Sequence, residues 1–305
     1  MRQIVVASAR RAPAIVRFLL SVAVVLAVYF LAGFVFGLMG FTPLARALYA
    51  TVLLAMLLWS FGALLFSLDQ VRSPLLEAAG LPLDREALRD AAAGTGFGVA
   101  AVSACVGIVA LGGHVHFEYV GAHPGAVLLS LWALVAAAMV EEVTFRGYPL
   151  HRLMEAIGAP AAVTVTSCLF GLAHLRNPHA SLLGAVNTAE IGALLGLAYV
   201  RTRSLWLCWG IHFGWNLALG LGYGLVVSGY SEFSVFMSGT LEGQRWLTGG
   251  DYGIEASVTA TAVNLAVIVA LLALVKRRPV PEIVLASPPL RITPDPAGSP
   301  KPGIQ

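Results

Sequence analysis

The segment GAVLLSLWALVAAAMVEEVTFRG, residues 125–147, joins an uncharged apolar run to two acids and a base. Sixteen apolar or small residues, Gly125–Val140, precede Glu141 and Glu142, and Arg146 lies four residues after the second acid. A run of this kind predicts a membrane-spanning helix, since a span takes about 20 mainly apolar residues. Charged side chains in such a helix must face protein or water, and this makes them candidates for function.

The rest of the chain is similarly apolar. Of its 305 residues, 58% are hydrophobic and only 11% are charged, whereas a soluble globular protein has about 25% charged residues. Eight apolar segments follow one another, at roughly 13–40, 44–67, 95–113, 124–141, 159–175, 182–200, 204–228 and 255–275. We therefore predict an all-α fold, a polytopic membrane helical bundle with about eight transmembrane helices.

The basic residues predict the orientation of this bundle. If the N-terminus is cytoplasmic and eight spans alternate, 16 of the 19 lysines and arginines fall on the cytoplasmic side and 3 fall outside. Loops rich in lysine and arginine stay in the cytoplasm. We therefore expect a multi-pass protein of the cytoplasmic membrane with both termini cytoplasmic.

The chain divides into four parts. Residues 1–123 hold N-terminal transmembrane helices and an amphipathic cytoplasmic segment, 68–93, for which a short surface helix and a solvated loop remain open. Residues 124–228 form a core that carries the polar residues, and 229–277 form an external loop and the last transmembrane helix. The proline-rich tail, 278–305, is expected to be disordered.

Glycines recur four residues apart, a spacing that lets helices approach closely in lipid. The pairs are Gly94/Gly98, Gly192/Gly196, Gly210/Gly214 and Gly220/Gly224. We interpret them as packing sites between helices.

The two acids of the opening segment are expected to differ in role. Glu142 and Arg146 lie one helical turn apart with the acid first, the favoured order for an ion pair. Arg146 can therefore neutralise Glu142. Glu141 points about 100° away around the helix and keeps its carboxylate free.

Two later spans also carry pairs at helical spacing. Phe170 and His174 lie one turn apart in the fifth segment, and His212 and Asn216 lie one turn apart in the seventh. A carboxylate, two imidazoles and an amide inside a dry bundle fit a hydrolase. A desolvated carboxylate can act as general base towards water, while histidine and asparagine can donate to an oxyanion.

Zinc is an open alternative. Glu141, His174 and His212 could hold the ion with a water molecule in an open position, so no cofactor is certain. The sequence contains neither HExxH nor GxSxG, and its spans contain no aspartate. These absences argue against zincin, serine and aspartyl proteases. The sequence has no basic stripe, zinc-finger spacing or glycine-rich phosphate loop, so neither nucleic acid nor nucleotide is an expected partner.

At these residues the sequence resembles the CPBP family of intramembrane proteases, which includes type II CAAX prenyl endopeptidases and bacterial Abi or bacteriocin-immunity proteins. The family pattern EExxxR, FxxxH and HxxxN is similar to EEVTFR at 141–146, FGLAH at 170–174 and HFGWN at 212–216. The resemblance covers residues 124–220. It implies eight transmembrane helices and hydrolysis of a peptide bond near the membrane surface.

The resemblance also implies roles for individual residues. Glu141 and His174 would activate water, and His212 and Asn216 would stabilise the oxyanion. Glu142 and Arg146 would support the site. Phe170 is a supporting residue by its spacing, since an aromatic ring one turn before His174 can wall off the pocket of that histidine. The substrate would be a membrane-associated peptide or protein, with a prenylated CAAX-type protein as one candidate. The family has been described both as zinc metalloendopeptidases and as metal-independent glutamate proteases.

The family motifs leave Glu190 unexplained. It lies in the middle of the sixth segment, within NTAEIGALLG. We interpret it as a supporting residue that approaches His212 or Arg146, or that lines a polar entry path.

Straight helices do not bring the candidate residues to one depth. At about 1.5 Å of rise per residue, Glu141 lies about 5 Å, His212 about 12 Å and His174 about 22 Å from the cytoplasmic edge. Two arrangements would bring these residues closer in depth, in a water-filled cavity open to the cytoplasm. The fourth helix could continue through Arg152, which we expect, or the fifth helix could begin in the cytoplasm just after the break at Ile157–Pro160.

Two other functions remain open. A proton-coupled transporter could use Glu141, Glu190 and the histidines as a relay, although the chain shows no inverted repeat. A non-catalytic membrane binding partner could retain the motifs, although the intact set of polar residues argues against lost catalysis.

Overall fold

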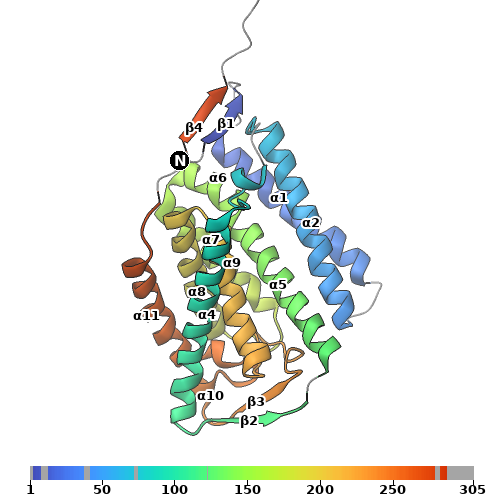
Figure 1. Ribbon diagram of the computed structural model, residues 1–305, viewed down its shortest axis with the longest axis vertical. Coiled ribbons are helices and arrows are strands. Elements are labelled where there is room, and N and C mark those ends of the chain that lie inside the picture. Colours follow the sequence, from blue (N-terminus) through green and yellow to red (C-terminus); the bar gives the residue numbers. More distant parts are fainter. Residues whose placement is uncertain are drawn as a thin grey trace, which may run out of the picture.

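The computed structural model describes residues 3–7, 13–37, 42–71, 75–121, 123–278 and 282–286 as an elongated helical bundle (Figure 1). The longer helices are α1 (Ala14–Gly37), α2 (Pro43–Ser67), α4 (Arg85–Leu111), α5 (Pro124–Arg146), α6 (Tyr148–Ile157), α7 (Ala159–Ala173), α8 (Leu182–Thr202), α9 (Leu205–Asn216) and α11 (Val258–Leu274). The short helices are α3 (Leu75–Ala78), η1 (His174–Arg176), η2 (Leu217–Gly222), α10 (Arg245–Thr248), η3 (Gly250–Tyr252) and η4 (Ile254–Ala256).

The all-α prediction is confirmed, and each of the eight apolar segments contains a helix. In the described part of the chain, five helical stretches are long and apolar enough to cross a membrane: α1, α2, α4, α5 together with α6, and α8. Helices α7, α9 and α11 are shorter, at 15, 12 and 17 residues. The strands form two small pairs. β1 (Gln3–Ala7) lies parallel to β4 (Glu282–Ala286), and β2 (Val115–Tyr119) lies antiparallel to β3 (Met237–Leu241).

The segment 68–93 differs from both predicted forms, a surface helix and a solvated loop. Among its described residues, 68–71 and 75–93, only α3 and the first turns of α4 are helical. The Asp84 carboxylate accepts the Ala87 N–H at 2.8 Å and begins α4 there. Leu81 is buried, and the Pro82 carbonyl accepts a hydrogen bond from Trp206. The segment is therefore a connection packed against the start of α9.

Helices α4 and α9 pack through the predicted glycines. A Cβ added at Gly98 would lie 2.1 Å from the Ile211 carbonyl oxygen, and one at Gly214 would lie 2.3 Å from the Thr95 carbonyl oxygen. Only a residue without a side chain permits this approach of two backbones. The spacing pattern is confirmed for this helix pair, which fixes where His212 stands.

Replacing one of these glycines should separate the two helices. For Gly98→Ala we expect a loss of about 3 kcal/mol, because the new methyl group would meet backbone that cannot rotate away. The melting temperature of the detergent-purified protein measures this. Gly96→Ala is the matched control, since a Cβ there has no atom within 4 Å. Equal melting temperatures for the two variants would contradict the packing argument.

Helix α5 does not end at its acids. It runs to Arg146, breaks at Gly147, and the chain resumes as α6 with Pro149 in its first turn. As expected, the chain stays helical beyond the acids and through Arg152, but it does so in two helices separated at Gly147. Because α6 carries the chain ten residues further, α7 starts beyond the end of α5 and returns along it. This return brings His174 level with Glu141.

The C-terminal segment is described only in part. The Arg278 guanidinium donates to both carboxylate oxygens of Asp90, at 2.7 and 2.5 Å. Strand β4 pairs with β1. The other residues of the predicted disordered tail, 279–281 and 287–305, lie outside the described residues.

Candidate active site

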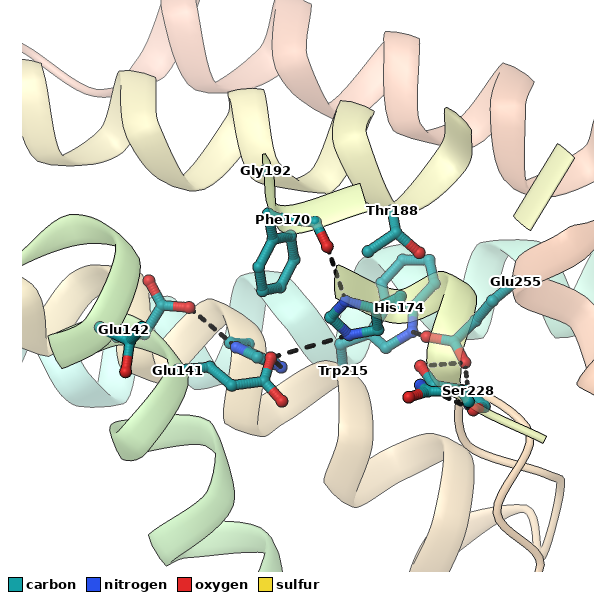
Figure 2. Close-up of polar contacts among 12 residues, drawn as sticks. Glu141, Glu142, Phe170, His174, Thr188, Gly192, Trp215, Ser228 and Glu255 are labelled. Carbon is teal, nitrogen blue, oxygen red and sulfur yellow. Dashed lines mark hydrogen bonds and ion pairs between the residues drawn. The ribbon is translucent and has the colours of Figure 1, made fainter. Parts of the chain in front are cut away.

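Three predicted motifs, on α5, on α7 and its η1 end, and on α9, meet in one place (Figure 2). The Oε2 atom of Glu141 lies 3.8 Å from His174 Nε2 and 3.7 Å from His212 Nε2. This carboxylate oxygen is buried and has no hydrogen-bond partner among the residues that the structure describes. A buried acceptor without a protein partner is normally satisfied by a donor from outside the protein, such as water or a substrate.

Glu142 is enclosed more completely than Glu141, although its Oε2 atom also has no hydrogen-bond partner among the described residues. Its side chain is fully buried, and its Oε1 atom accepts from Arg146 Nη1 at 3.3 Å and from His212 Nδ1 at 2.8 Å. The predicted ion pair between Glu142 and Arg146 is present. The carboxylate also orients the His212 ring, a contact that spacing along one helix does not reveal.

Arg146 is enclosed as completely as its partner. Its second terminal nitrogen donates to the Gly192 carbonyl of α8 at 3.2 Å, and its guanidinium carbon lies 4.2 Å from the centre of the Phe170 ring. A Cβ at Gly192 would lie 3.0 Å from Ser167 Cα, so this glycine lets α8 approach α7. The guanidinium is held by a carboxylate, a carbonyl and an aromatic face, three groups that suit a cation.

The hydrogen bonds assign the protons of both histidines. His174 Nδ1 lies 2.8 Å from the Phe170 carbonyl oxygen, and His212 Nδ1 lies 2.8 Å from the Glu142 carboxylate. Both partners can only accept, so we assign the proton of each neutral ring to Nδ1. Each Nε2 then presents a lone pair towards Glu141. Three acceptors separated by more than hydrogen-bond distance leave room for a donor between them, and one water molecule can supply it.

Asn216 lies on the wall of a cavity that also includes both histidines. The other lining residues are Phe170, Asn187, Thr188, Ile191, Ile211, Trp215, Ser228, Glu255, Ala260 and Asn264. The prediction that His212 and Asn216 face one cavity is therefore confirmed. The wall combines apolar side chains with a few polar groups, as in sites that bind small molecules or peptide side chains.

Glu190 lies against α11. Its carboxylate accepts a hydrogen bond from Asn264 at 3.3 Å. Residues two apart on a helix point about 200° apart, and Gly192 occupies the side of α8 that meets Arg146. Glu190 therefore faces away from Arg146, and the structure gives it a partner on α11 in place of the interpreted approach to His212 or Arg146.

Glu255 is a residue of this cavity that the sequence analysis missed. Its carboxylate accepts hydrogen bonds from Trp215 Nε1 at 3.1 Å, from Ser228 Oγ at 3.0 Å and from the Ser228 N–H. Figure 2 shows Glu141 and Glu255 on opposite sides of His174. The available signal is an acid at the first position of the last apolar segment, 255–275, a position typical of the edge of a span.

The zinc alternative gains no support from the structure. No group of three or more His, Cys, Asp or Glu side chains in the described part of the chain is arranged to hold a metal ion. Glu141, His174 and His212 converge, but the metalloendopeptidase interpretation finds no support in their arrangement.

Comparison with known proteins finds a family match for this region. Residues 123–218 match the family model described as type II CAAX prenyl endopeptidase Rce1-like. No curated protein matches the chain, and no solved structure matches it. The matched region contains all three motifs that meet at Glu141.

Proposed function

We propose that this protein is a membrane protease that hydrolyses a peptide bond in a membrane-associated peptide or protein, with Glu141 as the residue that activates water. The match of residues 123–218 to the Rce1-like type II CAAX prenyl endopeptidase family supports this proposal. The observation that carries the proposal is the buried, unpartnered Oε2 atom of Glu141, which faces the Nε2 atoms of two histidines. A water molecule is the donor that this arrangement lacks.

The first step forms the bond between water and the scissile carbonyl carbon. Water donates one hydrogen bond to Glu141 and another to His174 Nε2, and its oxygen attacks the carbonyl carbon as Glu141 takes the proton. The Glu141 proton then passes to the leaving amine as the carbon–nitrogen bond breaks. His174 keeps its orientation through the Phe170 carbonyl.

The oxyanion forms on the side of His212 and Asn216. The Asn216 amide can donate directly, and His212 donates from Nε2 when its ring carries both protons. Glu142 at His212 Nδ1 balances that positive charge, and Arg146 completes the charge balance. Donors placed where negative charge develops supply much of the rate enhancement in acyl transfer.

The topology is part of the same proposal. All eight apolar segments enter the membrane, with the shorter α7 and α9 packed among longer helices and both termini in the cytoplasm. The expected opening to the cytoplasm stays a prediction, since the cavity beside the histidines is lined by Ser228 and Glu255, next to the loop that this orientation places outside. A prenylated CAAX-type protein is one candidate substrate. The distribution of lysine and arginine supports this orientation.

Turnover by the purified protein tests the proposal. A membrane-anchored reporter peptide is incubated with the wild-type protein in lipid nanodiscs, and products are identified by mass spectrometry. We expect cleavage by the wild type and a loss of about 10²-fold or more for His174→Ala and for His212→Ala. Equal cleavage by the wild type and both variants would contradict the assignment.

A chelator arm of the same assay tests metal dependence. We expect turnover to stay unchanged after dialysis against EDTA or 1,10-phenanthroline. In the proposed mechanism Glu141 takes the proton of water and the histidines orient the reactants, so no step depends on a metal ion. A metalloprotease of known chelator sensitivity serves as the control for the treatment. Loss of turnover that zinc restores would contradict this expectation.

A further inference from the structure

The cavity beside the histidines contains a carboxylate whose charge has no counter-ion. Glu255 is half-buried, and its hydrogen-bond donors are the indole of Trp215 and the two groups of Ser228, all of them uncharged. No basic side chain among the described residues lies at ion-pair distance from it. An acid inside a bundle normally has a cationic partner or loses its charge.

Burial of Glu255 favours its protonated form, whereas its three hydrogen-bond donors favour the ionised form. Both carboxylate oxygens accept, which leaves no contact that requires a proton on Glu255. Ser228 adopts a φ of 48°, a conformation uncommon for residues other than glycine. In that conformation its N–H and its hydroxyl both reach Glu255. The turn is therefore shaped around an anion.

The same wall contains an acceptor without a hydrogen-bond partner. Asn264 is 1% exposed, and its amide nitrogen donates to the Asn187 carbonyl and to Glu190. These two acceptors fix the orientation of the amide, so the oxygen of Asn264 remains an acceptor. That oxygen is buried and has no hydrogen-bond partner in the described part of the chain. The wall thus offers an anion and a neutral acceptor, both suited to a donor with positive charge.

From these groups we infer that the cavity is a subsite for a basic side chain, lysine or arginine, of the substrate. The inference rests on the proposed function, since the same cavity is lined by His174, His212 and Asn216. An ammonium or guanidinium group in the subsite pairs with Glu255 and donates to Asn264. The peptide carrying it then lies with its scissile bond beside Glu141. Charge-assisted hydrogen bonds of this kind give strong discrimination against a neutral analogue.

Matched peptides test this subsite. In a set of membrane-anchored reporters, one lysine is moved through the positions around the scissile bond, and each peptide is compared with its norleucine counterpart. At one position we expect lysine to raise kcat/KM about tenfold over norleucine. Glu255→Gln should bring this ratio close to one, and Glu255→Asp should retain most of it. Glu242→Gln, an exposed acid of the same loop, should keep the wild-type ratio.

Two results would overturn the subsite. One is a wild-type ratio close to one at every position. The other is a Glu255→Gln variant that slows the lysine and norleucine peptides equally, which indicates that Glu255 only supports the fold or the charge of His174.

A binding arm separates this inference from the proposed function. The melting temperature of the full-length protein is measured with increasing n-butylammonium chloride and with sodium chloride. We expect n-butylammonium to raise it beyond sodium in the wild type and not in Glu255→Gln. An equal response to both salts means that the cavity takes any cation, and this overturns the subsite. If the wild type cleaves no peptide, the proposed function fails, while this arm still decides whether the cavity binds an ammonium group.

Discussion

Glu141→Gln should abolish peptide cleavage, with a loss of about 10²- to 10⁴-fold in kcat, while the protein remains folded. Glutamine keeps the size of the side chain but cannot take a proton from water. The Glu141 side chain is 30% exposed, and its contacts to the histidines, at 3.7 and 3.8 Å, are longer than hydrogen bonds. Its replacement should therefore cost little stability.

The initial rate at saturating reporter peptide measures the loss of kcat. The melting temperature measures whether the variant keeps its stability. Glu118→Gln is the matched control, because Glu118 is an exposed acid of β2 far along the chain from the three motifs. Its rate should equal that of the wild type. A Glu141→Gln variant that cleaves at the wild-type rate would remove the base from the proposed mechanism.

Arg146→Met should destabilise the protein by about 3–5 kcal/mol and also stop turnover. Arg146 and Glu142 are 1% and 0% exposed, so removing the arginine leaves a buried carboxylate without its cation. Methionine fills part of the space but provides no donor for the Gly192 carbonyl. The melting temperature in detergent measures the loss of stability.

Two comparisons separate the charge from the packing. Arg245 forms an ion pair with Asp251 on the surface, where the two side chains are 82% and 64% exposed. Arg245→Met should therefore change the stability by less than about 1 kcal/mol. The double variant Arg146→Met with Glu142→Leu should regain stability, since no unpaired charge remains. It should stay inactive, because His212 has lost its Nδ1 partner. A double variant no more stable than Arg146→Met would contradict the buried-charge argument.

The sequence predicts the local features of this site well. Helical spacing relates Glu142 to Arg146 and His212 to Asn216, because residues four apart on a helix face the same side. The ion pair and the shared cavity both follow from this rule. Composition likewise predicts a helical membrane protein, since no other class is so poor in charge.

Contacts between helices were less accessible from the sequence. The depth estimate placed Glu141 and His174 apart, and only the path through α6 brings them within 3.8 Å. Glu190 resembles an active-site acid by its position in a span, yet the rotation of α8 turns it towards Asn264. Glu255 resembles a residue at the end of a span, yet the turn at Ser228 encloses it.

Sequence alone therefore specifies which side of each helix is polar, because the helical repeat is a property of one short segment. Which polar sides meet depends on how far each helix extends, how it is rotated and how closely its glycines let a neighbour approach. These quantities arise from packing among segments far apart in the chain. The tertiary structure alone decides that Glu141 faces two histidines and that Glu255 lies on the wall of the same cavity.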